Sequence, residues 1–431
     1  MISLRSVVAA ALLAAPALTH AQTPAREELA LQDVVARALR QSPEIVQATS
    51  SVTTASSSER VAIGAFLPSL SLSSSAGLAS TERFNPTTNT TVTGSNDSYS
   101  AGLSAGVDLY TGGRRGAELK RAGATTDAAE ATLVERTFAV TLAAKQAYFD
   151  VAKAGELARV AQARLERAQE GLTAAQRRLQ VGSATRSDVL RAQLEENNAK
   201  QALASAQSQE RTASFALARL VGSETPVYAQ AFKEQVPRPL SVSEAELVSV
   251  VSEQAPAVTT AEANYEATRA SARAARAQYL PALRLSSGYD WFNQDAQFNG
   301  GNLSWTVRVG LSYPLFNGFT REDNIARAEA TARNASATAA DARLKARADF
   351  ERVMNALKLA EEQVALSTQA VEVAREDLRV QEERYRLGMS TILDRITSQV
   401  NLMDAENNEV AARYDYEIAR AQLEALIGRQ L

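Results

Sequence analysis

The sequence predicts a mainly α-helical chain in which one structural unit is repeated twice, with two β-strands and a long helical hairpin in each copy. Three observations support this fold class: landmarks that recur at a constant spacing, long tracts without proline, and segments in which apolar and polar residues alternate. The chain has 431 residues but only 11 prolines and 20 glycines. Because few positions interrupt regular structure, long elements are expected.

The composition excludes several function classes. The chain has 46 Lys and Arg against 49 Asp and Glu, a net charge of -3 that provides no basic field for nucleic acid. It has no Cys and a single His, His20, so thiolate zinc sites, thiol nucleophiles and the commonest general base are lacking from the rest of the chain. No phosphate loop, nucleophile elbow or ligand cluster occurs. We therefore expect no enzyme, and no catalytic, cofactor-binding or metal site.

Residues 1–21 have the pattern of a cleaved secretory signal peptide. Arg5 gives a cationic start, residues 7–18 are mostly apolar, and Thr19 and Ala21 are small residues before the expected cleavage point. After this segment no run of 18 apolar residues occurs, and the mean hydropathy is -0.21, which argues against a helical membrane protein. Cleavage would also remove His20. The sequence therefore predicts an exported protein.

Landmarks in the first half recur in the second half at two constant spacings. Ser42-Pro43 and Phe66-Leu67-Pro68 recur 213 positions later, as Ala255-Pro256 and Tyr279-Leu280-Pro281. Four later landmarks recur 206 positions on: Gly112 as Gly318, Gly182 as Gly388, Asp188 as Asp394, and Gly222 as Gly428. The slip of seven falls between the two strand-like segments, so the first half has the longer loop there. We expect a first repeat at 22–222, an inter-repeat linker or equatorial segment at 223–242, and a second repeat at 243–431, each with a helix, two strands and a long helical hairpin.

Long helices are predicted by the proline-free tracts that follow Pro86 and Pro314. Both tracts are rich in Ala, Leu, Glu, Gln and Arg, which favour helix. A heptad seam of mostly Ala and Leu runs through 151–179 and recurs, with two polar breaks, through 357–385, as expected for antiparallel coiled coils. A helix over about 116–179 would be roughly 95 Å long. Gly182 and Gly388 would then turn the chain back.

Two pairs of segments alternate as strands do. In 98–109 the odd positions are apolar or small and the even positions are Ser, Gly or Asp, and 303–315 repeats the pattern. Weaker alternation follows Pro68 and Pro281. Each segment has about the 9 to 11 residues that a tilted membrane strand needs, and a half-buried sheet of a soluble domain would alternate in the same way. The aromatic residues expected to face the membrane are Tyr99, Trp291, Trp305 and Tyr313.

Four strands are too few for a barrel. An open sheet in lipid would leave backbone groups at its edges without hydrogen bonds, so several chains would have to share one barrel. The signal peptide favours this arrangement over a soluble sheet. The long helical hairpins would continue the wall beyond the membrane as a helical tube. The sequence therefore predicts a channel.

Three motifs lie at matching places in this repeated order of elements. They are Phe66-Leu67-Pro68, Tyr279-Leu280-Pro281 and the string from Arg384 to Asp394 that contains Tyr385, Gly388 and Thr391. With these motifs the chain closely resembles the TolC family of outer-membrane efflux proteins. The resemblance implies a homotrimer in which coiled-coil helices form a periplasmic α-barrel and four strands per chain contribute to a trimeric 12-stranded outer-membrane β-barrel.

The resemblance further implies a location and a function. The protein would lie in the outer membrane of a Gram-negative bacterium and extend into the periplasm. It would be a passive exit duct that receives substrates from a periplasmic adaptor (a membrane fusion protein) and an inner-membrane pump or exporter, as in multidrug efflux and type I secretion. Its partners would be these proteins, two further copies of the chain and outer-membrane lipid, with no nucleic acid.

The resemblance also implies site residues at the periplasmic tip. Asp394 matches an acidic ring that closes the duct, and Thr397 stands at the second ring position. Tyr385 and Asp188 match a latch between the hairpins, whose basic partner is replaced by Ser390. The adaptor-docking tips would be Val181, Gly182, Ser183, Leu387, Gly388 and Met389. As an alternative, Asp188 and Asp394 are ordinary carboxylates at helix starts, favoured by the helix dipole.

A different class of protein stays open on the sequence. A secreted or periplasmic coiled-coil structural or adaptor protein without a pore would share the signal peptide and the heptads. An adaptor should have a single hairpin set with β-rich domains, however, and a structural coiled coil has no need of amphipathic strands before each long helix. The strands therefore favour the duct.

Overall fold

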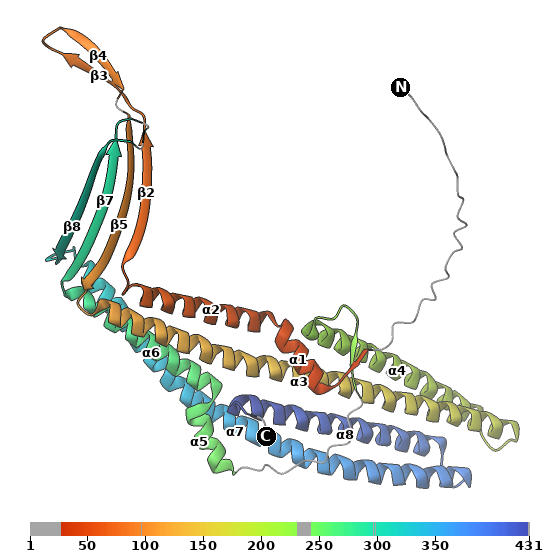
Figure 1. Ribbon diagram of the computed structural model, residues 1–431. Helices are drawn as coiled ribbons and strands as arrows, with labels where there is room; N and C mark the ends of the chain where they lie inside the picture. The colour runs from red at the N-terminus through yellow and green to blue at the C-terminus, as the bar shows by residue number, and fades with distance from the viewer. Residues whose placement is uncertain (1–26, 96, 231–242, 296, 298, 430–431) are drawn as a thin grey trace, which may run out of the picture.

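The computed structural model describes residues 27–95, 97–230, 243–295, 297 and 299–429. The predicted signal peptide at 1–21 and residues 231–242 of the predicted linker lie outside these residues. Figure 1 shows an elongated molecule with a narrow β-sheet at one end and two long helical hairpins that point away from it. In the described part of the chain, no helix is both long and apolar enough to cross a membrane.

The two halves of the chain contain the same main elements. The first half comprises β1 (Glu27–Leu29), α1 (Leu31–Gln41), α2 (Pro43–Gly64), β2 (Ser69–Gly77), β3 (Ser80–Asn85), β4 (Thr90–Ser95), β5 (Ser98–Tyr110), α3 (Arg114–Gln180), α4 (Arg186–Val221) and β6 (Val227–Ala229). The second comprises α5 (Glu244–Gln254), α6 (Pro256–Arg276), a 3-10 turn (Ala277–Tyr279), β7 (Ala282–Asn293), β8 (Asn302–Ser312), α7 (Thr320–Arg386) and α8 (Ile392–Ile427). Helices α3 and α7 each have 67 residues, and α4 and α8 each have 36. The predicted fold class, mainly helical and internally duplicated with four strands in one main sheet, is confirmed.

Two helices precede each strand pair, where the sequence predicted one. Pro43 begins α2 and Pro256 begins α6, each at the first helical position. Proline has no N–H for the helix ladder, and it holds the preceding residue in an extended conformation. Ser42 accordingly has ψ 123° and Ala255 has ψ 136°. The chain therefore bends at both prolines.

Glycines end the helices of both hairpins. Gly182 and Gly388 follow α3 and α7 with φ of 73° and 75°, and Gly222 and Gly428 cap α4 and α8 with φ of 68° and 70°. Left-handed backbone of this kind costs glycine little, because glycine has no Cβ. The 206-residue spacing of these landmarks in the sequence thus corresponds to equivalent turns in the structure.

The main sheet has the strand order β2-β5-β7-β8, with every pair antiparallel. Its register puts apolar side chains on one face, and one row across the four strands consists of Leu72, Leu103, Tyr289 and Trp305. The next row, on the opposite face, consists of Ser71, Ser104, Gly288 and Thr306. In the described chain, β2 and β8 each have a neighbour on one side only. The sheet therefore has two open edges.

The hairpin β3–β4 was not predicted. It lies within the loop that the repeat spacing predicts to be longer in the first half, and it extends beyond the outer end of the main sheet (Figure 1). Its sequence is rich in Thr and contains Pro86, with no alternation of apolar residues that would indicate a strand. Backbone pairing between Ser80 and Ser95 defines it instead.

The helices pack as two hairpins joined by α3 and α8. Helix α3 contacts α4 and α8, and α8 contacts α7, so α4 and α7 lie on the two outer sides. The heptad seam is largely buried in both hairpins. Its buried members include Val151, Ala158, Ala161, Ala168, Ala175, Leu357, Ala360, Val364, Val371, Leu378 and Tyr385. Small Ala at many of these positions lets the helix axes approach closely.

Charged pairs join the repeats along the α3–α8 contact. The pairs are Lys145 with Glu424, Lys153 with Asp415 at 3.0 Å, Glu156 with Arg413 at 2.7 Å, and Arg167 with Glu406 at 3.3 Å. The Tyr414 hydroxyl also donates to Glu156 at 2.8 Å, and burial raises the pKa of Tyr414 well above its usual value. A short parallel pairing of β1 with β6 ties the start of the described chain to the predicted inter-repeat linker, in which β6 lies.

Candidate functional site

The two helical turns lie together at the end of the molecule opposite the sheet (Figure 1). The Arg178 guanidinium of the first hairpin donates to the backbone carbonyl of Arg386 in the second, at 2.8 Å. All six predicted docking residues are exposed, and among them Val181, Leu387 and Met389 expose between 65% and 77% of their surface. Exposed apolar side chains at both turns make the tips a candidate contact surface.

Asp188 and Asp394 both close the first turn of a helix. The Asp394 carboxylate accepts hydrogen bonds from the Thr391 backbone N–H and hydroxyl, both at 2.8 Å, and the Asp394 N–H donates to the Thr391 hydroxyl oxygen at 3.2 Å. Thr185 and Asp188 form the same capping box at the start of α4. These bonds, led by the backbone N–H, lower the pKa of both carboxyls below the usual aspartate value. The expected helix-start role is therefore present in the structure.

The two residues of the predicted gate, Asp394 and Thr397, lie near the start of α8. The Asp394 side chain is exposed, and Thr397 is exposed three residues later on the same face of α8. Both capping bonds use the Oδ2 atom of Asp394, and Oδ1 accepts no hydrogen bond within the described chain. A charged, exposed carboxylate can thus serve as a cap and still attract cations.

Tyr385 lies at the contact between the hairpins, although its contacts differ from those of the predicted latch. It is 9% exposed and packs with Ala175, Ala192 and Ile392. The Arg178 guanidinium carbon lies 4.3 Å from the centre of the Tyr385 ring, and that of Arg395 lies at 5.4 Å. Among the described residues no hydrogen bond joins Tyr385 to Asp188. The third residue of the predicted latch, Ser390, donates instead to the Gln381 carbonyl at 3.4 Å.

Arg395 is a residue of the tip that sequence reasoning missed. It is only 8% exposed and has no carboxylate partner within the described chain, and its Nε has no hydrogen-bond partner there. Burial lowers the pKa of Arg395 below its usual value. The equivalent position 206 residues earlier is Val189, an ordinary apolar residue of the same contact. A comparison of the repeats at this position could have found it.

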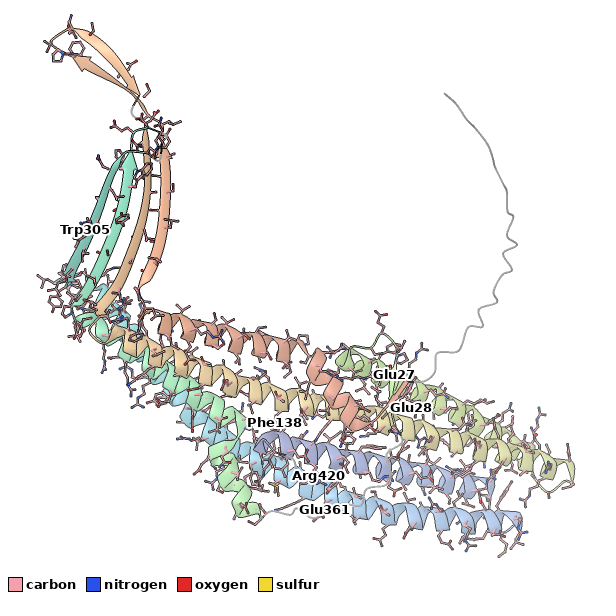
Figure 2. All side chains as sticks on the ribbon, viewed as in Figure 1. Glu27, Glu28, Phe138, Trp305, Glu361 and Arg420 are labelled. Carbon is pink, nitrogen blue, oxygen red and sulfur yellow. The ribbon has the colours of Figure 1, made fainter. Side chains whose placement is uncertain are left out.

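Three of the aromatic residues predicted to face the membrane lie on the apolar face of the sheet, and the fourth, Tyr313, directly follows β8. Trp305 of β8 is 73% exposed and Tyr313, just after β8, is 51% exposed, whereas Tyr99 and Trp291 are half-buried in the single chain. Figure 2 shows Trp305 on the outermost strand, far from the helical tips. The Trp291 indole donates to the carbonyl of Gly300 at 3.1 Å, in the turn that joins β7 to β8.

Known proteins resemble the chain over most of its length. The model of the outer membrane efflux protein family matches residues 34–223 and 247–429. The chain is 27% identical to the pyoverdine export outer membrane protein OpmQ of Pseudomonas aeruginosa over 92% of this chain and 83% of OpmQ. It is also 27% identical to protein CyaE of Bordetella pertussis, over 92% of this chain and 84% of CyaE.

Solved structures share the fold. The outer membrane protein VceC of Vibrio cholerae superposes with a TM-score of 0.77 at 22% identity, over 93% of this chain and 96% of VceC. The family match covers both repeats, including the strands and the helical tips described above. The chain therefore belongs to the outer membrane efflux protein family, as its resemblance to the TolC family predicts.

Proposed function

We propose that this outer-membrane efflux protein works as a homotrimeric exit duct that is passive and gated at its periplasmic tip. Substrates would enter from a periplasmic adaptor and an inner-membrane pump or exporter, cross the periplasm within the helical tube and leave through the barrel. The observation that supports this proposal best is that the single chain has two pairs of open edges, one pair in the sheet and one pair in the helices.

The first pair of open edges belongs to the sheet. Strands β2 and β8 have unpaired sides within the described chain, and each carries exposed apolar residues such as Leu72 and Val307. Unpaired backbone groups are costly in lipid, so pairing β8 of one copy with β2 of the next would satisfy both. Three copies would supply twelve strands, enough to close around a lumen.

The second pair of open edges belongs to the helices. On α7, Leu359, Leu366, Val373 and Val380 follow one another at intervals of seven, and their exposed fractions run from 38% to 66%. On α4, Leu190, Leu194 and Phe215 are exposed by 44% to 61%. A heptad stripe of this kind is typical of a coiled-coil contact. Pairing α7 of one copy with α4 of the next would cover both stripes in the same trimer that closes the barrel.

The tip supports the proposed gate. In a trimer, Asp394 from each copy would give a ring of three carboxylates, and rings of charged side chains select and hold ions in pores. Tyr385, Asp188 and Ser390 remain the predicted latch, and the stacking of Arg178 and Arg395 on Tyr385 adds a contact between the hairpins. The exposed Val181, Leu387 and Met389 would be available to an adaptor.

Engineered cysteines test the trimer directly, because the natural chain has none. Leu72→Cys on β2 would be combined in turn with Trp305→Cys, Val307→Cys and Val309→Cys on β8. Within one chain β5 and β7 separate these strands by about 14 Å, too far for a disulfide. We expect oxidation of at least one pair to give a covalent trimer on a denaturing gel. The matched control, Leu72→Cys alone, should give none.

The outcome also separates the duct from a coiled-coil protein without a pore. A covalent trimer that conducts ions in a planar bilayer would support the duct. If every pair gave only monomers, and the purified protein formed no pores, the strands would not belong to a shared barrel and the proposal would be wrong.

A further inference from the structure

We propose that Arg284 and Arg308 form a positive belt in the lumen of the barrel and bind the anionic group, a carboxylate or phosphate, of a passing solute. We call these two residues the arginine belt. The inference rests on the trimeric duct proposed above, in which the polar face of the sheet lines the lumen.

The Arg284 guanidinium reaches the row of the sheet to which Arg308 belongs. One row of the sheet runs Ser69, Gly106, Ser286 and Arg308, so Arg308 belongs to this row directly. Arg284 starts two residues nearer the helices on β7, but its side chain leans over Gly106: a Cβ added to Gly106 would lie 3.0 Å from Arg284 Nη2. Glycine at position 106 therefore leaves the space that brings Arg284 into the row.

The belt carries an excess of positive charge. Arg284 Nη1 lies 3.7 Å from Asp108 Oδ1, a single long contact, and the Arg284 side chain is 63% exposed. Arg308 is exposed and has no acidic partner within the described chain. Each copy therefore contributes two guanidinium groups and one carboxylate. A trimer would have six guanidinium groups and three carboxylates at this height.

The remaining lumen carboxylate stands apart from the belt. Asp290 lies four residues beyond Ser286 on β7, toward the outer end, which corresponds to about 13 Å along the strand. Gly102 and Gly288 leave room for its carboxylate against the wall, because a Cβ on Gly288 would lie 3.2 Å from Asp290 Oδ2. About 13 Å separates the backbone positions, against a screening length of about 8 Å at physiological salt, so Asp290 offsets the charge of the belt only in part.

The strands do not need these charges in order to form. At the equivalent positions of the first repeat the residues are the uncharged Ser71 and Gly102. They pair with Ser104 and Ser73 in the same sheet. Arginine also differs from lysine in presenting a flat fork of N–H donors that fits a carboxylate or a phosphate. The positions, the excess charge and the donor geometry together fit an anion-binding ring of the kind that selects solutes in pores.

Ion selectivity of the complete protein in planar bilayers tests the belt. The reversal potential would be measured in a KCl gradient for the unmodified protein and for Arg308→Gln, Arg284→Gln and Asp290→Asn. We expect the two arginine variants to shift selectivity toward K⁺ and Asp290→Asn to shift it toward Cl⁻. The matched control is Thr306→Gln, which puts the same side chain two residues away on the same face without changing a charge, and it should cause no shift.

Anion binding itself is tested with citrate in divalent-free buffer. Citrate should block the unmodified channel in a voltage-dependent way, whereas acetate at equal ionic strength should not. Arg308→Gln should weaken the block by about tenfold, the loss expected for a charge-assisted contact. Arg308→Lys should keep the K⁺/Cl⁻ selectivity but bind citrate more weakly, because lysine lacks the fork.

The outcomes separate the belt from the duct. Pores with no citrate block in the unmodified protein, or with selectivity and block unchanged in Arg308→Gln, would overturn the belt and leave the duct intact. If the arginine variants do not assemble, the unmodified protein still tests the belt, because citrate should block it and acetate should not. A protein that forms no pores would overturn the duct, and the belt with it.

Discussion

The guanidinium of Arg395 on α8 occupies the space beside Gly171 on α3 in which any larger residue would place its Cβ. This contact joins the second hairpin to the first at the helical tips, next to the Tyr385 ring. Arg395 is buried with no carboxylate within salt-bridge distance in the described chain, so the niche beside Gly171 and the Tyr385 ring hold its side chain. The absence of a side chain at Gly171 therefore makes room for the Arg395 guanidinium where the two hairpins meet.

Gly171→Ala should loosen the tip. The added Cβ would displace the Arg395 guanidinium, and the overpacking cost of about 1–3 kcal/mol is partly offset by the about 1 kcal/mol by which Ala is favoured over Gly inside a helix. Amide hydrogen exchange near residues 165–180 should become faster, by up to about thirtyfold. The matched control is Gly155→Ala in the same helix, where the new Cβ would lie at an ordinary 3.5 Å from Glu210 and the variant should lose no protection. Equal exchange in both variants would contradict the niche.

Two variants of Tyr385 should separate the two possible latches. Tyr385→Phe keeps the ring beneath Arg178 and Arg395 but removes the hydroxyl that a hydrogen bond to Asp188 would need. The stacking observed here predicts that Tyr385→Phe keeps the low conductance of a closed tip, while Tyr385→Leu loses about 0.5–2 kcal/mol of cation–π attraction and conducts more often. Single-channel recording checks this. An open channel in Tyr385→Phe would favour the hydroxyl latch instead.

The Thr391 hydroxyl should set the pH range in which Asp394 carries its charge. Hydrogen bonds from Thr391 lower the pKa of Asp394, so their stabilisation is present above the pKa of an unfolded aspartate and is lost as pH falls through the lower folded value. Thr391→Val removes the hydroxyl donor and should move that pKa upward. As pH falls, Asp394 becomes protonated and divalent cations should stop blocking the channel. In Thr391→Val this loss of block should occur at a higher pH than in the unmodified protein. An unchanged midpoint would mean that Asp394 does not produce the block.

The ion pair between Lys145 and Glu424 should stabilise the junction of the repeats only while both partners are present. Their side chains are 16% and 14% exposed. Lys145→Met leaves the nearly buried Glu424 with Arg420 at 4.0 Å as a remaining charged partner, so the loss should stay below the about 3–5 kcal/mol of a buried charge left without one. The double variant Lys145→Met with Glu424→Leu should recover much of this loss, as measured by thermal unfolding in detergent. If the double variant were no more stable than Lys145→Met alone, the loss would not come from leaving the Glu424 carboxylate without Lys145.

Much of the fold followed from the sequence because its signals are periodic. The constant spacing between Gly182 and Gly388 placed the two turns, and the heptads of α3 and α7 identified the seam that is buried in the structure. Alternation in β5 and β8 predicted which residues share a face. Regular elements repeat the same local geometry, so a repeat in the sequence carries enough information to predict them.

Features that depend on a single contact could not be predicted in this way. The hairpin β3–β4 has no apolar face, so nothing periodic indicated it. The contact between Arg395 and Gly171 joins positions far apart in the sequence. The family resemblance predicted Asp188, and not an arginine, as the partner of Tyr385. The lean of Arg284 over Gly106 likewise depends on sheet register, which alternation alone does not fix.

Single-channel conductance of the purified complete protein in planar bilayers tests the central claim most directly. The unmodified protein and Asp394→Ala would be compared over a range of divalent-cation concentrations. A gated outer-membrane duct predicts a small conductance that cations block in the unmodified protein, and a larger conductance that is insensitive to them in the variant. If the two proteins behaved alike, Asp394 would not form the constriction, and a complete absence of pores would contradict the duct itself.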